Sequence, residues 1–246
     1  MSFPTVIFGA EHTVYATTAA RRYPFGTLLV TQDGRKFRYA ENAGTAIAAG
    51  RLAQSAIPGA NFDELVSAAA AVGAKVITVT TGATAISADD FFMGYLNVED
   101  DTGEGHLYHL DSHLAIATTT AGDMNLFPPG VRVATVAATT VGLTKHYLKD
   151  IVIHDSVPTA MLAGVPPSTL AADNFGWVQR GGPASVLTDG TVVIGFSVMA
   201  SNGTDGAVEA WGLAEAAPPT EIGPLCGWVM EVAATTEHSL IYLKLE

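Results

Sequence analysis

The chain has 246 residues, a formal net charge of −12 and a single cysteine, and only 15% of its residues are charged. This length suffices to bury a large core in one β domain or two smaller ones, and one cysteine excludes an intramolecular disulfide. No run approaches the roughly 20 apolar residues of a membrane span, and the first residues lack a signal-peptide pattern, so we expect a soluble protein made in a cytoplasm, with no membrane partner.

The composition also predicts a surface poor in charge, because the mean hydropathy is +0.30. A monomer this apolar has few polar groups to cover its surface, which favours an assembly subunit that buries part of that surface against partners. Six basic side chains accompany only three acids among residues 1–51, whereas the remainder is strongly acidic. Charges this dilute make a poor phosphate-binding surface, so we expect docking onto acidic protein neighbours and no nucleic-acid partner.

The N-terminal part reads as an arm. Residues 1–25 contain isolated apolar side chains without a sustained period, which predicts an extended segment. From Gly26 two short strand-like runs flank Asp33-Gly34, the pattern of a β-hairpin. We therefore predict that residues 1–58 form an extended N-terminal arm that carries a hairpin. The candidate interface residues of this arm are Arg21, Arg22, Arg35, Lys36, Phe37, Arg38, Tyr39 and Arg51.

Residues 61–73 carry a local helix signal, with Asn61 as a candidate N-cap, early acids, a run of alanines and Gly73 as a stop. Strand-like sequence surrounds this segment, so helix and strand both stay open, and we expect at most one short helix in the chain. The acidic stretch at residues 99–104 is predicted to be a solvated turn. It fails as a calcium loop because Thr102 stands where an EF-hand frame starting at Asn97 needs glycine.

One group of side chains has the residue types of a metal site: His106, His109, Asp111 and His113. On a regular strand the last three would share one face, so a metal is geometrically possible. Leu110, however, occupies the place of the general-base Glu in the zinc-protease pattern, and histidines scattered along strands are commonly polar-face residues. We predict no metal site and no cofactor.

Residues 175–198 predict a packed hairpin. An aromatic and glycine-rich run is followed by Asp189-Gly190, which suits a tight turn, and then by a second run rich in β-branched and aromatic residues. The core candidates are Phe175, Trp177, Pro183 and Trp228. The single Cys226 lies in an apolar run and is predicted to be a buried, inert thiol.

Short strands with turn signals recur along the whole chain, which predicts an all-β fold. We expect a β-sandwich or barrel body, jelly-roll-like, over residues 59–246. Two sub-lobes joined near residues 157–174 are one arrangement of this body, because Pro166-Pro167 blocks regular structure there. No nucleophile elbow, phosphate-binding loop, dinucleotide fingerprint or paired-cysteine motif occurs, so we do not expect an enzyme.

Three stretches together resemble the capsid cement or decoration proteins of tailed bacteriophages: residues 23–54, 94–110 and 164–195. That group has a glycine-led strand and a DGR-F-Y hairpin near the N-terminus, and an aromatic-Trp-x-Gln-x-Gly-Pro-Ala segment in the C-terminal half. Gly176 and Arg180 depart from this pattern. The matching positions are Gly26, Asp33, Gly34, Arg35, Phe37, Tyr39, Phe175, Trp177, Gln179, Gly182, Pro183 and Ala184.

The resemblance implies a virion protein on the exterior of the capsid, made in the host cytoplasm. Such a protein binds the outer surface of the phage head, clamps neighbouring major capsid protein subunits and forms a homotrimer. An alternative is a tail or fibre adhesin that binds a host surface glycan, with Trp211 and Tyr95 as candidate stacking residues. A β-sandwich enzyme of unknown substrate is a third possibility, which a metal held by His109 and His113 would favour.

Overall fold

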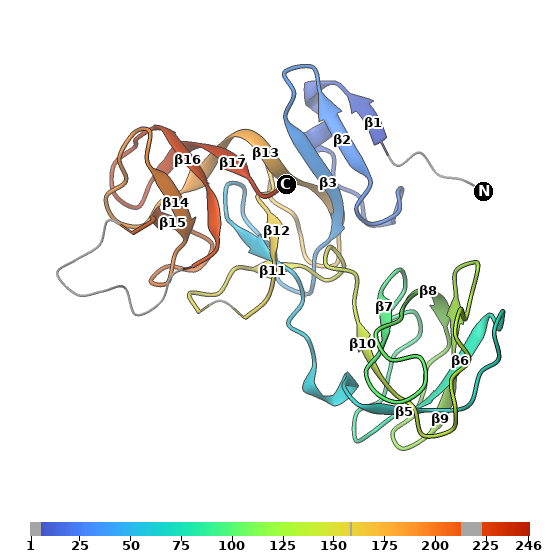
Figure 1. Cartoon of the computed structure of the whole chain (residues 1–246). Coiled ribbons are helices and arrows are strands. Elements are labelled where there is room, and N and C mark those ends of the chain that lie inside the picture. The colour runs from blue at the N-terminus through green and yellow to red at the C-terminus, as the bar shows by residue number, and fades with distance from the viewer. Residues whose placement is uncertain (1–5, 158, 213–222) are drawn as a thin grey trace. The chain divides into compact units, whose positions relative to one another are not determined.

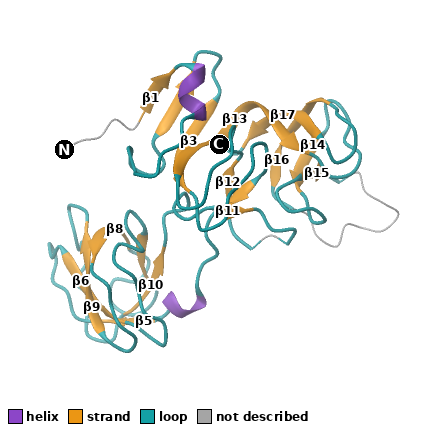
Figure 2. Cartoon of the chain, turned by 180° about the vertical axis from the view of Figure 1, so that it is seen from behind, coloured by secondary structure: helices purple, strands orange, loops and turns teal. Residues whose placement is uncertain are grey.

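The computed structural model describes residues 6–157, 159–212 and 223–246 (Figure 1). The regular structure in these ranges consists of β-strands and two short 3-10 helices, η1 (Glu11–Tyr15) and η2 (Ala60–Phe62) (Figure 2). The expectation of an all-β fold with barrel and sheet architecture is confirmed.

The chain forms two compact units. The larger unit comprises Met1–Ala56 and Tyr147–Glu246, and the smaller unit comprises Ile57–His146. This division differs from the predicted arm of residues 1–58 and body of residues 59–246, and its junctions lie outside residues 157–174. The physical reason is strand pairing: the predicted hairpin forms, but its second strand pairs with a strand of the C-terminal half. The hairpin therefore belongs to the larger unit.

An eight-stranded sheet organises the larger unit. From one edge to the other its strands are β1 (Val6–Gly9), β2 (Leu28–Thr31), β3 (Lys36–Glu41), β13 (Phe175–Leu187), β17 (His238–Lys244), β16 (Leu225–Glu231), β14 (Ser197–Ala200) and β15 (Val208–Ala210). The β1–β2 pair is parallel and the other pairs are antiparallel. A three-stranded sheet of β11 (Val152–Ile153), β4 (Ala53–Gln54) and β12 (Leu162–Gly164) completes the unit.

The long strand β13 joins the two halves of the large sheet (Figure 1). Its first part, residues 175–181, pairs with β3, and its second part, residues 181–187, pairs with β17. The two partners thus meet at Gly181, next to a register shift between Gln179 and Gly181. Such a bulge bends a strand and increases its twist, which lets one strand serve two neighbours.

The N-terminal hairpin forms as predicted, whereas the predicted hairpin at residues 175–198 does not. At the first, Gly34 donates its amide to the carbonyl of Thr31 and has a φ of +84°. At the second, residues 191–196 form no strand, and β14 begins only at Ser197 and pairs with β15 and β16. The amide of Asp189 bonds to Val208 rather than closing a two-residue turn.

Residues 6–25 are not a free extended arm. β1 pairs with β2, Val14 in η1 is buried, and Thr18 exchanges backbone hydrogen bonds with Phe175. The isolated apolar side chains of this segment therefore find their surface within the same unit. Residues 1–5 of the predicted arm lie outside the described residues.

The smaller unit is a closed six-stranded barrel in which each strand has two neighbours. In order around the barrel its strands are β10 (Thr140–Thr144), β5 (Leu65–Ser67), β6 (Val76–Thr80), β9 (Ala121–Leu126), β8 (Leu107–His113) and β7 (Tyr95–Val98). Alternating side chains such as Ile77 and Val79 on β6 and Leu110 on β8 fill its interior. Closure removes the exposed strand edges that open sheets must protect.

Residues 61–73 do not form an α-helix. They contain the end of η2 and the strand β5, which pairs with β6 and β10. Leu65 and Ser67 point into the barrel and Val66 points outward, which is strand periodicity. Barrel closure therefore overrides the helix propensity of the following alanine run, since propensity is a weak prior that tertiary pairing often reverses.

Candidate interaction surface

An aromatic cluster holds the N-terminal hairpin onto β13. Tyr39 and Trp177 are register partners on β3 and β13, and they are buried together with Phe37, Leu29 and Val14. Phe37 and Tyr39 are therefore core residues, not the interface residues that the sequence predicted. Residues of η1 and β13 in the same chain pack over the aromatic face of the hairpin.

The four predicted core residues divide into two groups. Trp177 is buried as predicted, and the half-buried Phe175 packs on the same cluster, with its ring stacked 6.2 Å from that of Tyr39. Pro183 and Trp228 are only half-buried and lie on the outer face of the sheet. For these two residues the prediction of core packing is corrected.

Arg35 ties η1 to the turn of the hairpin. Its guanidinium forms an ion pair with Glu11 and another with Asp33, where Nε lies 2.6 Å from Oδ2. Tyr15 donates its hydroxyl to the same Glu11 at 2.8 Å, and this hydrogen bond raises the pKa of Tyr15. The hydroxyl of Thr31 donates to Asp33 and lowers the pKa of that carboxyl. The positive charge of Arg35 is thus neutralised locally.

Most of the other predicted basic interface residues also contact their own unit. Arg38 donates to Glu246 at 2.9 Å and to the carbonyl of Gly26 at 2.8 Å. Arg51 donates to the carbonyl of Asp205 at 2.7 Å. Arg21 lies 5.5 Å from the ring centroid of Phe25, and the amide of Arg22 donates to the hydroxyl of Tyr39. Lys36 differs, because its side chain is exposed beside a groove.

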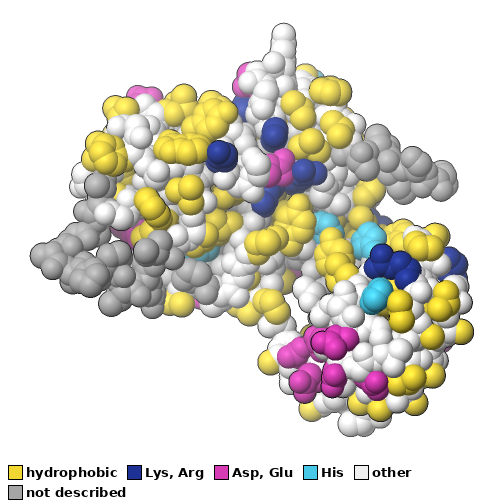
Figure 3. Space-filling model, viewed as in Figure 1, with side chains coloured by type: hydrophobic (Ala, Val, Ile, Leu, Met, Phe, Trp, Pro, Cys, Tyr) yellow, Lys and Arg dark blue, Asp and Glu magenta, His cyan; other side chains and the backbone are white. Residues whose placement is uncertain are grey.

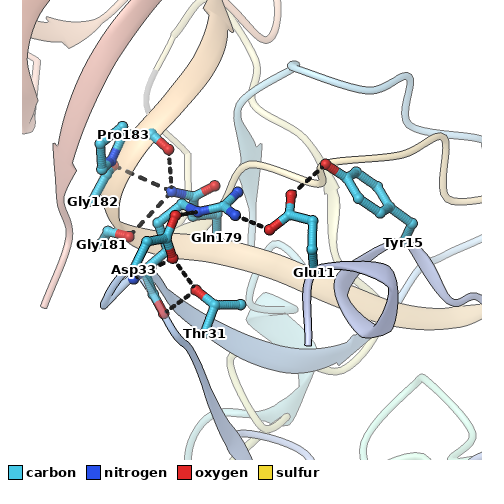
Figure 4. Close-up of polar contacts among 9 residues, drawn as sticks. Glu11, Tyr15, Thr31, Asp33, Gln179, Gly181, Gly182 and Pro183 are labelled. Atoms are coloured by element: carbon cyan, nitrogen blue, oxygen red, sulfur yellow. Dashed lines mark hydrogen bonds and ion pairs between the residues drawn. The ribbon is translucent and has the colours of Figure 1, made fainter. Parts of the chain in front are cut away.

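A glutamine that no chemical motif singled out maintains the bend of β13. The buried side-chain amide of Gln179 shares its N–H groups among the carbonyls of Gly181, Gly182 and Pro183, at 3.1, 3.2 and 2.8 Å (Figure 4). Gly182 has a φ of +86°, and a Cβ there would lie 2.9 Å from Cγ of Arg35. The Trp-x-Gln-x-Gly-Gly-Pro pattern is therefore a bulge with its own support, since buried carbonyls need donors.

Arg180 performs a similar bracing role beside that bulge. Its buried guanidinium donates to the carbonyls of Leu162, Ala163 and Leu245, at 2.8, 2.7 and 2.9 Å. Burial lowers the pKa of Arg180, and the carboxylate of Glu246 at 3.5 Å opposes that effect. The residue joins β12 and the C-terminal segment to β13.

The free edge of β1 is the most exposed apolar feature of the large sheet. β1 occupies one end of the strand order and, among the described residues, pairs only with β2. Its side chains alternate, so that Val6 and Phe8 face outward and are 43% and 83% exposed. An unprotected apolar strand edge can pair with a strand of another chain, and natural proteins usually cover such edges.

Two grooves lie on the larger unit near the bulge. The larger, of about 560 Å³, includes Tyr15, Arg35 and Gln179 in its lining, but the contacts described above already occupy their polar atoms. The smaller, of about 280 Å³, is lined in part by Lys36, Trp228, Tyr242 and Lys244. In the space-filling view, a group of acidic side chains lies on one part of the smaller unit, and Lys and Arg side chains are visible on both units (Figure 3).

The metal-like histidines are separated by a bulge in β8. The register shifts between Leu110 and Ser112, so His113 turns into the barrel, whereas His109 lies on the other face. His113 accepts the amide of Phe91 at Nε2, and its Nδ1 lies 3.0 Å from the carbonyl of Leu114. Among the described residues no three His, Cys, Asp or Glu side chains are placed to share a metal ion. The shared face expected for residues 109, 111 and 113 is therefore absent.

Tyr95, one predicted stacking residue, already has ring partners. His109 and His146 stack on it with centroids 5.6 and 6.3 Å away. Burial and the nearby His109 lower the pKa of His146 to about 4, so the His146 ring is neutral at pH 7. Trp211, the other candidate, is 45% exposed.

In the part of the chain that the structure describes, no helix is both long and apolar enough to cross a bilayer. Comparisons with protein-family models, with curated proteins and with solved structures found no match to this chain.

Proposed function

We propose that this protein is a virion structural protein that binds the outer surface of a phage head and clamps neighbouring major capsid protein subunits. The observation that carries the proposal is the free edge of β1, with Phe8 83% exposed at the end of an eight-stranded sheet. Main-chain groups along such an edge can pair with a strand of a neighbouring subunit, and an outward aromatic side chain adds apolar contact.

The surface composition supports the same function. Large apolar side chains are exposed on both units, for example Ile194 at 63% and Leu114 at 82%, while only 15% of the residues are charged. Scattered single residues need no explanation, but a sheet edge and a weakly charged surface together suit repeated contacts between subunits. The net charge of −12 would keep the free protein soluble before assembly. Symmetric contacts with two further copies, as a homotrimer, belong to this proposal.

The test is occupancy on purified heads that lack the protein. The double variant V6D/F8D places two carboxylates on the edge of β1 without touching its buried face, and we expect it to lose head binding. L114D is the matched control, because it makes the same change at a residue that is 82% exposed on the smaller unit. Deletion of residues 1–25 is less informative, because it would remove the buried Val14 as well.

Both variants need an unchanged unfolding midpoint for the comparison to count. If V6D/F8D folds normally and still saturates heads, β1 is not the contact and the proposal loses its main support. If neither the wild-type chain nor any variant binds heads of the phage that encodes it, the cement function is wrong.

A further inference from the structure

We propose that the smaller groove of the larger unit is a binding site for an anionic saccharide, in which two lysines hold the acid group and an aromatic strip holds the sugar ring. The site is built from the outer faces of β3, β13, β17 and β16. It does not depend on head binding, so it stands or falls separately from the proposed function.

The cationic half of the site is a row of three register partners. Lys36 on β3 lies opposite Gly181 on β13, and Gly181 lies opposite Lys244 on β17. Directly opposite residues point to the same face of a sheet, so both lysines extend from one face. Because Gly181 has no side chain, the surface between them is open, and a Cβ added there would lie 3.5 Å from the stem of Lys36.

The aromatic half is the adjacent row of the same sheet. Pro183 on β13 lies opposite Tyr242 on β17, and Tyr242 lies opposite Trp228 on β16. Tyr242 is 45% exposed and Trp228 is half-buried. The ammonium of Lys244 lies 5.2 Å from the centroid of Trp228, which connects the two rows. A flat apolar strip with polar edges suits a ligand with one apolar face and a polar rim.

The local charge selects an anion. On a chain with a net charge of −12, neither Lys36 nor Lys244 has a carboxylate partner among the described residues. The one acid in the groove lining, Glu246, is paired with Arg38 at 2.9 Å and with Arg180 at 3.5 Å. No carboxylate among the described residues therefore neutralises either lysine, although the Lys244 ammonium also lies over the Trp228 ring, and a lysine pair acts as two point charges that suit a carboxylate.

Size and shape favour a sugar residue over an extended peptide. A volume of about 280 Å³ is at the small end of ligand sites, so one acidic residue of a longer saccharide would occupy the groove. The acidic side chains of a peptide would use the lysines, but they offer no apolar ring face to Tyr242 and Trp228. The aromatic row therefore decides between the two anionic partners.

The test is a titration of the full chain with tetragalacturonate, followed by calorimetry and by NMR of the tryptophan indoles. We expect saturable binding that K36Q/K244Q weakens by about tenfold or more, as does Y242S, since each removes a direct contact. The matched control is K75Q, an exposed lysine of the smaller unit, and it should bind like wild type. Neutral cellotetraose should bind at least about tenfold more weakly.

Three results would overturn the site. A hexaglutamate peptide that binds as tightly as tetragalacturonate would show a site for acidic peptides. Complete displacement by equimolar sulfate would show a simple anion site without ring recognition. The saccharide would be excluded if the wild-type chain did not bind tetragalacturonate while its unfolding curve showed that it was folded.

Discussion

Trp177 meets Tyr39 edge-to-face across the β13–β3 pair, with ring centroids 5.1 Å apart and ring planes at 66°. About 140 residues of sequence separate the two rings, yet they are direct register partners. Tyr23 completes the group, with its ring 5.2 Å from Tyr39 and 5.5 Å from Trp177. This contact fixes the N-terminal hairpin to the C-terminal half of the chain.

Replacing Trp177 with alanine should therefore be strongly destabilising. We expect the free energy of unfolding of W177A to fall by about 3–5 kcal/mol, from lost burial and a residual cavity. Urea unfolding followed by circular dichroism measures the change. W211A, at a site 45% exposed, should change stability by no more than about 0.5 kcal/mol. A W177A variant that keeps its stability but loses head binding would show that Trp177 belongs to an interface instead.

The side chain of Gln179 should stabilise the bulge measurably. In Q179A the carbonyls of Gly181, Gly182 and Pro183 lose their shared donor, and we expect a loss of about 1–3 kcal/mol. The exposed Gln32 provides the control variant Q32A, which should be close to neutral. Equal stabilities for the two variants would mean that Gly182 and the strand pairing alone set the bend.

Cys226 should be chemically inert in the folded protein. The thiol is fully buried, and burial raises its pKa to about 12, so the thiol stays protonated at pH 8. We expect no reaction with an aromatic disulfide reagent until guanidinium unfolds the larger unit. The S87C variant carries a thiol at an exposed turn and should react at once under the same native conditions. Prompt modification of Cys226 would contradict its placement in the core.

His154 should make the protein acid-sensitive. It is fully buried, neither ring nitrogen has a hydrogen-bond partner among the described residues, and burial lowers its pKa while Asp155 and Asp205 oppose the shift. Below about pH 6.5 the unfolded chain binds a proton that the folded chain excludes, so stability falls as the pH drops through that range.

The variant H154L isolates this contribution. Half-buried acids such as Glu41 and Glu209, whose pKa values partial burial raises, act in the opposite direction, but they contribute equally to both proteins. We expect the unfolding free energy of H154L to change less between pH 7 and pH 5 than that of wild type. At pH 7 we expect H154L to be at least as stable as wild type. Identical pH profiles would show that His154 does not titrate in this range.

The barrel should fold in isolation. Residues 57–146 form a contiguous unit with its own core, so the excised segment should unfold cooperatively and show a β circular-dichroism spectrum. Residues 1–56 alone should remain unfolded, because β3 then lacks β13 and the aromatic cluster lacks Trp177. If the 1–56 fragment folded by itself, this result would support the prediction that the N-terminal arm is separate from the rest of the chain.

Local chemistry accounts for what the sequence predicted well. The Asp33-Gly34 turn was recognisable because Gly34 supplies a positive φ between two alternating runs. The burial of Trp177 and Cys226 followed from their apolar surroundings. The all-β class followed from the spacing of short strands, although their pairing order did not.

Non-local pairing accounts for most of what the sequence did not predict. Nothing near Phe37 and Tyr39 indicates that β13, more than 130 residues later, covers them. The alanine run after Asn61 favours a helix locally, but β5 gains two partner strands when the barrel closes. The bulge in β8 separates His109 from His113, and no glycine or proline marks its position in the sequence. Of the two groove lysines, only Lys36 was predicted from the sequence as a contact residue. Lys244 lies near Lys36 only because β13 pairs with both β3 and β17.

The insertion of the barrel between Ala56 and Tyr147 has a consequence for biosynthesis. The barrel has all its strands once residue 144 has been translated, whereas the large sheet waits for β13 and then for β17, which ends at Lys244. During translation β3 therefore lacks its partner β13, and Phe37 and Tyr39 remain exposed. The completed barrel leaves the ribosome while the hairpin is still in this state. Such delayed long-range pairing slows folding and exposes apolar strands to association. We expect nascent chains stalled before β13 to depend on chaperones far more than chains stalled after β17.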